Sequence, residues 1–419
     1  MTTEPSDPTE GLTLADVDVQ NPDVFQQGRH HAMFAVLRRD APVHFQTEPD
    51  GRGFWCITKH ADLSIINRDY AGFSSSGGIN IPDADEAQQS AVENMMLYMD
   101  PPRHTRYRLL VNKGFTPRMI GQLEDSLRLR TRAIVNNICE KGECDFVEEI
   151  AAELPLQAIA DLMGVPQEDR KQLFEWSNRM VGFDDPEFQG SMDDGLAAAA
   201  EMYVFFNALA ADRRRDPKAD IVTTLVNAEI EGDRLTEEEF DMFSLLLTVA
   251  GNETTRNATA HGMKALIDHP AEYAKLSANT SRETLDRAVE EILRWATPVL
   301  HFRRTATADV ELRGQQIKEG DKVVMWHISA NRDEEVFDDP MDFRIDRWPN
   351  EQLAFGGGGP HFCLGTNLAR MELRLIFEEL ATRIPDMTMT SPPEMLRSNF
   401  IGGIKRMPVK FTPSRPLAV

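Results

Sequence analysis

Residues 355–365 of this 419-residue chain read FGGGGPHFCLG, four glycines followed closely by a histidine and a cysteine. Glycine adopts backbone conformations barred to other residues, so such a run lets the main chain approach a flat ligand closely. Cys363 stands just before a predicted amphipathic helix at residues 364–384, which Pro385 ends. The dipole and free N–H groups of a helix N-terminus favour a thiolate. The stretch therefore predicts a loop that presents Cys363 to a bound group.

Three other interpretations of this stretch stay open on the residues alone. A single cysteine beside a helix is often a buried apolar residue. A glycine-rich loop before a helix can hold a phosphate group, although no Gly-Lys-Ser/Thr sequence follows and no clear strand leads into it. Cys363 and His361 could also act together as a thiol hydrolase.

A second unusual feature is a long predicted helix. Thr236 and Glu239 form a capping box at its start. The helical pattern then continues until Pro270 ends it, which corresponds to about 50 Å. Its centre, residues 249–255, reads VAGNETT and is a poor helix former where a core helix should be strongest. Poor helix-forming residues in the middle of a core helix are a reason to suspect a functional role for this segment.

The rest of the chain has a helix-rich body followed by short β-like runs and an irregular segment. It lacks the alternating strands and helices of a doubly wound fold. We therefore expect a mainly α fold with a small β part. The predicted regions are a helical segment at 29–39, a β-like run at 53–58, helices over about 117–287, β-like runs at 308–312 and 322–326, and an irregular segment at 331–359.

Taken together, these features resemble the cytochrome P-450 family. The 355–365 loop is similar to the family's cysteine signature, although Phe355 lies eight residues before the cysteine where the common signature has seven. The resemblance covers roughly residues 23–413 and implies the cytochrome P-450 fold, with heme between the long central helix and the cysteine loop. Four further landmarks follow the family's order: HTRYR at 104–108, AGNET at 250–254, EILR at 291–294 and FRRTA at 302–306.

The resemblance also implies the roles of particular residues. Cys363 is implied to be the thiolate ligand of the iron of heme b, which promotes cleavage of bound O2. Thr254 and Glu253 are implied to relay protons as the catalytic pair, and Glu291 and Arg294 to form a buried structural pair. The implied cofactor-binding residues are His104, Arg108, Ala250, Gly251, Arg304, Phe355, Gly356, His361, Cys363 and Gly365, of which His104, Arg108, Arg304 and His361 pair the propionates.

Each landmark also has a plainer interpretation. Glu291 and Arg294 are one helical turn apart and could form an ordinary surface pair. Thr254 could merely bond back to a carbonyl and bend the helix. The histidines and arginines assigned to the propionates could be solvated surface groups.

The motifs look most like those of bacterial members, the steroid C26-monooxygenases and methyl-branched lipid omega-hydroxylases. The implied activity is a monooxygenase that inserts one oxygen atom of O2 into a C–H bond of a steroid or sterol side chain or a branched lipid. Methionines at 95, 96 and 99 suit an adaptable apolar wall, although at least two of the three are expected to pack in the core. The alternatives are hydroxylation of a small terpene, a peroxide-driven peroxygenase of the same fold, and a Cys-His thiol hydrolase without heme.

No fused flavin or iron–sulfur domain is evident, so the resemblance implies that electrons derived from NAD(P)H arrive through a ferredoxin and a ferredoxin reductase. An acidic chain can still carry a local basic patch for an acidic partner. Solvated helix faces are the alternative for each candidate. The candidate basic contacts are Arg106, Lys113, Arg118, Arg370 and Arg374.

Composition bears on the partners, the cellular compartment and the domain organisation. The net charge of −23 argues against binding to nucleic acid or to an anionic membrane. Four cysteines without a close-spaced framework are typical of a reducing compartment. Residues 1–20 are predicted to be a mobile tail that is neither a signal peptide nor an anchor, and residues 21–419 a single domain. We expect a cytoplasmic monomer.

Overall fold

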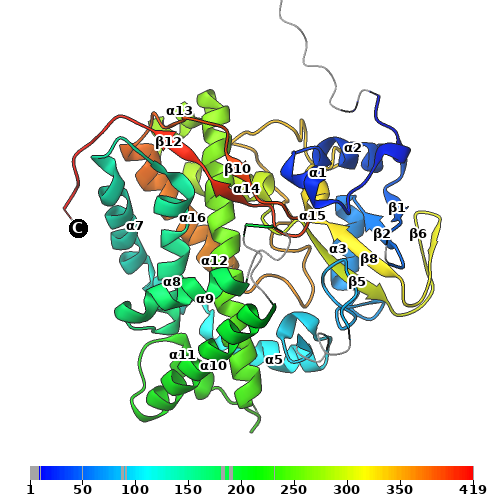
Figure 1. Cartoon of the computed structure of the whole chain (residues 1–419), viewed down its shortest axis with the longest axis horizontal. Helices are drawn as coiled ribbons and strands as arrows, with labels where there is room; N and C mark the ends of the chain where they lie inside the picture. Colours follow the sequence, from blue (N-terminus) through cyan, green and yellow to red (C-terminus); the bar gives the residue numbers. More distant parts are fainter. Residues whose placement is uncertain are drawn as a thin grey trace, which may run out of the picture.

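The predicted long helix is α12, Glu237–Asp268, and it runs through the middle of the molecule (Figure 1). The capping box is present: the Glu239 N–H donates to Thr236 Oγ1 at 3.1 Å, and the Thr236 N–H donates to Glu239 Oε2 at 2.9 Å. The helix ends directly before His269 and Pro270, and it is continuous through its weak centre. The computed structural model describes residues 9, 11–49, 51–85, 89, 92–180, 185–187, 192–230 and 232–418.

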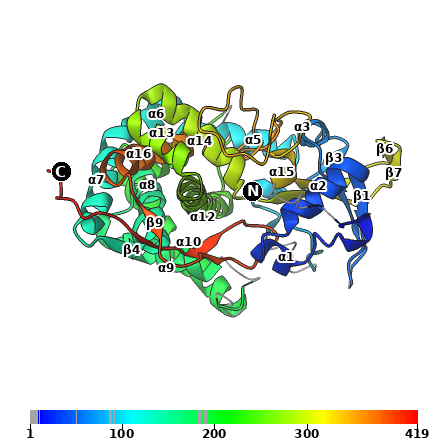
Figure 2. The ribbon, with the colours of Figure 1, turned by 90° about the horizontal axis from the view of Figure 1, so that it is seen from above.

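Most of the other long helices surround α12 on one side of the molecule, as Figure 2 shows in a view nearly along α12. The helices packed against α12 include α8 (Glu153–Met163), α10 (Met192–Arg215), α14 (Arg282–Ala296) and α16 (Thr366–Arg383). Their buried apolar side chains form the largest hydrophobic core. Helix α16 confirms the helix predicted at residues 364–384.

The main sheet lies on the other side of α12 and contains five strands in the order β1-β2-β8-β5-β3. Strands β2 and β8 are parallel, and the other neighbours are antiparallel. Two further clusters of buried apolar side chains pack around this sheet. The strands are β1 (Val43–Gln46), β2 (Phe54–Ile57), β3 (Phe73–Ser74), β5 (His301–Ala306) and β8 (Lys322–Trp326).

Smaller elements complete the fold, and together they confirm the predicted mainly α fold with a small β part. The remaining helices are α1 (Pro22–Gln26), α2 (His30–Asp40), α3 (His60–Arg68), α5 (Arg103–Val111), α6 (Pro117–Gln122), α7 (Glu124–Cys139), α9 (Arg170–Met180), α11 (Ile221–Val226), α13 (Pro270–Ala278) and α15 (His327–Ala330). The remaining strands are β4 (Glu143–Asp145), β6 (Val310–Leu312), β7 (Gln315–Ile317), β9 (Thr388–Met389), β10 (Glu394–Met395), β11 (Ile404–Arg406) and β12 (Pro408–Lys410). Among the described helices, none is both long and apolar enough to cross a membrane.

The start of the chain differs from the expected tail. Residues Leu14–Asp16 form a short 3-10 helix, and Val17 and Val19 are buried in a core cluster with side chains of α1 and α2. The packed chain therefore begins before residue 21, because two valines supply apolar surface that the polar composition of the segment obscures. Residues 1–8 and 10 of the expected tail lie outside the described residues.

Candidate functional site

A cavity between α12 and the 355–365 loop brings together most of the predicted site residues. Its empty volume, including the part open to solvent, is about 1540 Å³. Glu253, Glu291 and Arg294 are not among the residues that line it. The predicted residues that do line it are His104, Arg108, Ala250, Gly251, Thr254, Arg304, Phe355, Gly356, His361, Cys363 and Gly365.

The 355–365 loop holds Cys363 by main-chain hydrogen bonds. The Cys363 N–H donates to the Phe355 carbonyl at 3.0 Å, which closes the loop on itself despite the additional glycine. Gly365 is the N-cap of α16, and the Thr366 hydroxyl donates to the Cys363 carbonyl at 2.8 Å. The ring of Phe355 also lies under the Arg370 guanidinium, 4.8 Å from its carbon. The loop and the start of α16 therefore fix the cysteine together.

The glycine run serves helix packing more than ligand approach. A Cβ atom at Gly359 would lie 2.0 Å from the Asn67 carbonyl oxygen, and one at Gly357 would lie 3.0 Å from the Cα atom of Ser64. Both neighbours belong to α3. Gly356 lines the cavity, and its φ of +92° favours glycine. Of the four glycines expected to approach a flat ligand, only Gly356 lines the cavity.

The pKa of the Cys363 thiol is raised, contrary to the expectation from its place beside a helix. Desolvation by the surrounding protein raises it, and this outweighs the Gly365 N–H, the Thr366 hydroxyl and the cations Arg108 and Arg370, which lower it. Part of the surface of Cys363 is accessible, and this accessible part faces the cavity. A cation bound at the sulfur would supply the stabilisation that the thiolate lacks.

One edge of the cavity carries positive or hydrogen-bond-donating groups that form no ion pair among the described residues. Arg304 is 5% exposed, and within the described chain its one hydrogen bond goes to the Arg303 carbonyl at 2.8 Å. Desolvation lowers the pKa of Arg304 to about 10, although Asp100 opposes this shift. Arg108 donates to Asn112 Oδ1 at 3.0 Å and to the Phe362 carbonyl at 2.7 Å. Neither guanidinium forms an ion pair among the described residues.

Two histidines complete this edge. The rings of His104 and His361 are 4.3 Å apart. Both ring nitrogens of His104 are buried without a partner, and desolvation lowers its pKa to about 4. The Nε2 atom of His361 lies 3.1 Å from the Met99 carbonyl and 3.1 Å from Ser75 Oγ, and desolvation lowers its pKa to about 2. No hydrogen bond joins His361 to Cys363 in the described chain, so the hydrolase pair is absent.

His327 is a site residue that the sequence analysis missed. It lines the cavity, is 3% exposed, and has no hydrogen-bond partner on either ring nitrogen. Desolvation and the charge of Arg304 lower its pKa to about 3, and the backbone of Met325 opposes this shift. No local signal points to it, because it follows an apolar strand.

These residues fit heme. A cavity with one thiol among its described lining residues and an edge of arginine and histidine side chains without ion pairs matches a flat apolar ring that carries iron and two carboxylates. Buried donors and cations are costly when they stay unpaired. Cys363 would hold the iron, and Arg304, Arg108, His104 and His361 would pair the carboxylates.

The centre of α12 faces the cavity through Ala250, Gly251 and Thr254. The Thr254 hydroxyl donates to the Ala250 carbonyl at 2.8 Å, which is the back-bonded arrangement considered above. A Cβ atom at Gly251 would lie 2.4 Å from Ile159 Cδ1, so this glycine also admits α8. The helix thus approaches both the cavity and α8 at its weak centre.

Glu253 lies away from the cavity wall. It is 4% exposed and forms an ion pair with Arg256 at 2.5 Å. Burial raises the pKa of Glu253, although Arg256 opposes the shift. In this arrangement the structure does not bring Glu253 and Thr254 together at one point.

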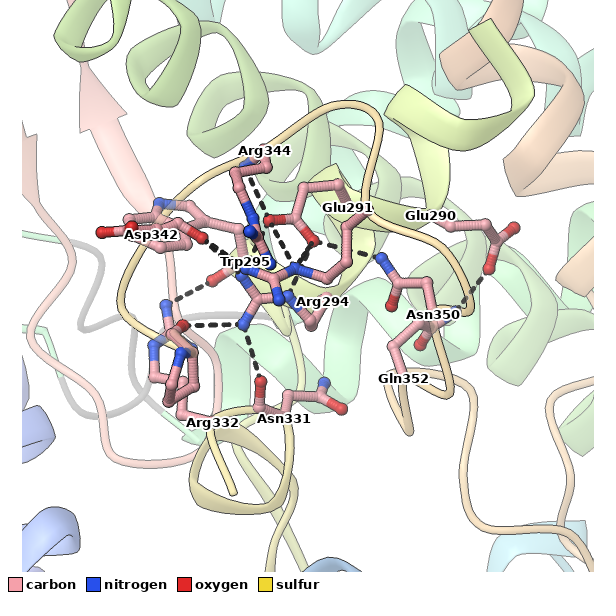
Figure 3. A network of polar contacts seen from close by, with 12 residues as sticks. Glu290, Glu291, Arg294, Trp295, Asn331, Arg332, Asp342, Arg344, Asn350 and Gln352 are labelled. Atoms are coloured by element: carbon pink, nitrogen blue, oxygen red, sulfur yellow. Dashed lines mark hydrogen bonds and ion pairs between the residues drawn. The ribbon is translucent and has the colours of Figure 1, made fainter. Parts of the chain in front are cut away.

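Glu291 and Arg294 form a buried ion pair rather than a surface pair (Figure 3). Both side chains are 0% exposed. Arg294 donates to Glu291 at 2.7 and 2.8 Å and to the carbonyls of Asn331, Pro340 and Asp342. All of its N–H groups are used within the protein.

Glu291 also receives donors from the irregular segment before the cysteine loop. The Arg344 N–H lies 2.9 Å from Glu291 Oε1, Asn350 Nδ2 lies 3.1 Å from Oε2, and Arg347 Nε lies 3.1 Å from Oε2. The segment continues into the 355–365 loop, where the Gly356 N–H donates to the Leu353 carbonyl at 2.9 Å. The buried pair therefore anchors the chain that leads to Cys363.

Comparison with known proteins gives concordant matches. The family model described as Cytochrome P450 matches residues 119–383. The steroid C26-monooxygenase of Mycolicibacterium smegmatis is 44% identical over 90% of this chain and 90% of its own length. The methyl-branched lipid omega-hydroxylase of Mycobacterium tuberculosis (strain H37Rv) is 40% identical over 97% of each chain. The structure of cytochrome P-450 CYP268A2 of Mycobacterium marinum in complex with pseudoionone matches with a TM-score of 0.85, 37% identity, and coverage of 98% of this chain and 100% of that chain.

Proposed function

The chain belongs to the cytochrome P-450 family and is a heme-thiolate monooxygenase, and on this premise we propose that it hydroxylates a steroid side chain or a methyl-branched lipid. Two curated relatives at 40% identity or more carry those activities in their names. When bound, heme with a thiolate ligand supplies the activation of O2 and the insertion of one oxygen atom into a C–H bond. The protein supplies position and exclusion of water.

The distal cavity wall supports a hydrophobic substrate. Away from the cationic edge, most of the lining side chains are aliphatic or aromatic, although Thr254, Thr255 and Glu372 also line the cavity. Burial of apolar surface favours an apolar ligand. Met96 belongs to this wall, as expected from the methionine-rich segment, whereas Met99 packs beside it and does not line the cavity. The lining apolar residues on this side include Ile79, Met96, Leu97, Phe115, Phe243, Leu246, Leu247, Val299 and Phe302.

The observation that carries the proposal is the placement of Cys363. Its sulfur faces a cavity whose edge consists of donors without counterions. We propose Cys363 as the iron ligand, with Arg304, Arg108, His104 and His361 as carboxylate partners. The remaining proposed cofactor contacts are Ala250, Gly251, Phe355, Gly356 and Gly365, all of which line the cavity.

The direct test is the carbon monoxide difference spectrum of the reduced protein. The unsubstituted protein should give the long-wavelength band of thiolate ligation, and Cys363→Ser should lose it. Cys144→Ser is a matched control, because that cysteine lies on strand β4 outside the cavity and should leave the band unchanged. A thiolate band in the Cys363→Ser protein would reject the ligand assignment.

We propose that Thr254 holds a proton on the cavity side of α12. Its hydroxyl is already oriented by the Ala250 carbonyl at 2.8 Å. A relay that continues through Glu253 would require its ion pair with Arg256 to open. Thr254→Ala should raise the fraction of reductant that is lost to hydrogen peroxide, because the group that delivers the proton is gone. Unchanged coupling of reductant to product would remove Thr254 from the relay.

We propose a ferredoxin and its reductase as the electron source, with Lys113 and Arg118 as contacts. Both are exposed; Lys113 donates to the Glu229 carbonyl at 2.7 Å, and neither forms an ion pair among the described residues. Charge reversal at either should slow reduction in a salt-dependent way. The other three candidates are paired internally, Arg106 with Asp233 and Glu239, Arg370 with Glu290, and Arg374 with Glu124.

A small terpenoid is a second candidate substrate, because the structure of the Mycobacterium marinum relative contains pseudoionone. The two candidates separate by size. Titration of the resting enzyme with cholesterol, phytanic acid and pseudoionone, followed by the heme absorbance, ranks them. Activity that needs only hydrogen peroxide and no reductase would instead favour the peroxygenase alternative.

A further inference from the structure

One residue of the cavity wall, Ile79, comes from an irregular loop, residues 77–83. This 77–83 loop follows strand β3 and folds back over β5, and its residue Ile79 is buried and lines the cavity. The Arg303 backbone N–H donates to the Ile79 carbonyl at 2.8 Å. That bond places Ile79 next to β5, but a single main-chain bond does not fix a seven-residue loop.

The side chain of Arg303 supplies most of the missing donors. Its Nη2 atom donates to the Gly77 carbonyl at 3.0 Å. Its Nη1 atom lies 3.3 Å from the Asn80 carbonyl, 3.3 Å from the Ile81 carbonyl and 3.2 Å from the Pro82 carbonyl. The side chain is 2% exposed. One buried guanidinium therefore lies within hydrogen-bond distance of four carbonyls of the loop, and the two hydrogens of Nη1 are shared among three of them.

Charge complements these hydrogen bonds at the end of the loop. Asp83 lies 2.8 Å from Arg303 Nη2, 3.1 Å from Arg52 Nη2 and 3.4 Å from Lys322 Nζ. Lys322, which is 1% exposed, also donates to the Ile81 carbonyl at 3.0 Å and pairs with Glu48. Partial burial would raise the pKa of Asp83, but Arg52, Arg303 and Lys322 lower it to about 2. The loop end is thus ionised and bound to buried cations.

The sequence of the loop is adapted to this contact. A Cβ atom at Gly77 would lie 2.3 Å from Thr305 Oγ1, so a larger residue would push the loop off β5. Gly78 has a φ of +120° and would place a Cβ atom 3.5 Å from Arg303 Nη1. The loop therefore lies against β5 and the guanidinium because glycine occupies both positions.

Arg303 and Arg304 divide their roles by strand geometry. Successive side chains of a strand point to opposite faces. Arg304 lines the cavity, whereas Arg303 does not line it and is directed to the loop. We propose that Arg303 is a positioning residue that fixes the 77–83 loop, and through Ile79 the distal wall, so that it determines which bulky hydrophobic molecules bind. This inference rests on the proposed function, because it presupposes heme in the cavity.

The test compares two iron ligands of different size on the heme-loaded protein. Imidazole needs only the iron, whereas clotrimazole also fills the space bounded by the distal wall. In Arg303→Gln the Kd of clotrimazole should rise roughly tenfold, because about one charge-assisted hydrogen bond that holds the loop is lost. The Kd of imidazole should stay within about twofold. Arg303→Lys should give an intermediate Kd, because a lysine still pairs with Asp83 but cannot reach all four carbonyls.

Arg313→Gln is the matched control. Arg313 likewise pairs with one carboxylate, Asp62 Oδ2 at 2.6 Å, but it is 37% exposed and joins the β6–β7 turn to α3. Its substitution should leave both Kd values unchanged. A lower melting temperature in Arg303→Gln with an unchanged clotrimazole Kd would make Arg303 a merely structural residue and overturn the proposal. An equal loss for both ligands would overturn it as well, because the effect would then lie at the heme.

Asp83→Asn covers the case in which Arg303→Gln does not fold. Asp83 is 42% exposed, and its substitution removes the charge that Arg303 shares with Arg52 and Lys322 while all four carbonyl contacts of Arg303 stay. The clotrimazole Kd should rise about threefold without a change for imidazole, and no selective rise would count against Arg303. Failure of the proposed function and failure of this inference give different results. If the unsubstituted protein lacks the thiolate band in the carbon monoxide spectrum, both are rejected. If the band is normal but the variants change the Kd values of clotrimazole and imidazole equally or not at all, only the inference is rejected.

Discussion

Two buried arginines of this molecule are compensated in opposite ways. Arg294 is fully buried, and the protein satisfies it completely through Glu291 and three carbonyls. Arg304 is almost as buried, yet within the described chain it donates only to the Arg303 carbonyl and forms no ion pair. The pKa of Arg304 is lowered to about 10 by desolvation.

This difference separates a structural cation from one that is kept for a ligand. Burying a charge without a counterion is costly, and a protein that retains such a charge gains from it only when a bound anion completes the pair. Arg304 shares its surroundings with His104 and His327, whose ring nitrogens also lack partners. The state of pairing, more than burial or residue type, therefore marks the ligand site.

The largest expected effect is that of Glu291→Ala, which tests whether Arg294 is a structural cation. It would leave Arg294 and Arg347 buried without their carboxylate, so we expect a loss of about 3–5 kcal/mol in the free energy of unfolding and protein without stable heme. Denaturant unfolding and heme content measure this. Glu283→Ala, which removes an exposed helical pair with Arg287, should cost less than about 1 kcal/mol. Full heme incorporation and normal unfolding in Glu291→Ala would refute the structural role.

Arg304→Met should weaken heme binding without destabilising the heme-free protein. The heme-free protein should be as stable as the unsubstituted one or more stable, because an unpaired buried charge is removed. Heme affinity should fall about 10- to 100-fold, the equivalent of a charge-assisted hydrogen bond. Unfolding of the heme-free protein and the rate of heme transfer to apomyoglobin measure the two effects. A destabilised heme-free protein with normal heme retention would make Arg304 structural, like Arg294.

The loss of stability at acidic pH should differ between the heme-free and the heme-bound protein because of His104. Its pKa is about 4 in the folded protein against an ordinary value of 6.5, because desolvation and the cations Arg108 and Arg304 outweigh Asp100. The unfolded chain therefore takes up a proton first as the pH falls, and stability present above pH 6.5 is lost down to about pH 4. The expected slope is about 1.4 kcal/mol per pH unit from this residue.

A carboxylate bound beside His104 would stabilise its charged form and reduce this loss. Unfolding of the two forms between those pH limits measures the difference, and His104→Gln should reduce the slope of the heme-free form by the contribution of this one residue. Equal acid sensitivity with and without heme would show that no carboxylate of the ligand lies beside His104.

The smallest expected effect is that of His327→Leu. Because both ring nitrogens lack a partner, the heme-free protein should be unchanged or slightly more stable. Heme should be lost about threefold to tenfold faster, since a neutral hydrogen bond contributes about 0.5–1.5 kcal/mol. The heme-transfer rate checks this. An unchanged rate, with altered binding of substrate, would place His327 against the substrate instead.

Local signals in the chain predicted the parts of the molecule that depend on near neighbours. The capping box at Thr236 and the stop at Pro270 located α12, and the run at 322–326 coincides with β8. The spacing of motifs around Cys363 led to the family and to the residues that line the cavity. These inferences hold because caps, proline breaks and strand patterns act within a few residues of the chain.

Tertiary structure decided what each polar residue is paired with. Arg303 serves a loop more than 200 residues earlier in the chain, and Glu253 turns to Arg256 instead of the cavity. Gly357 and Gly359 are required by α3 rather than by a ligand, and His327 becomes a site residue only because the chain brings it beside Arg304. Pairing and desolvation depend on distances through space, and no pattern along the chain encodes whether a buried charge has found its counterion.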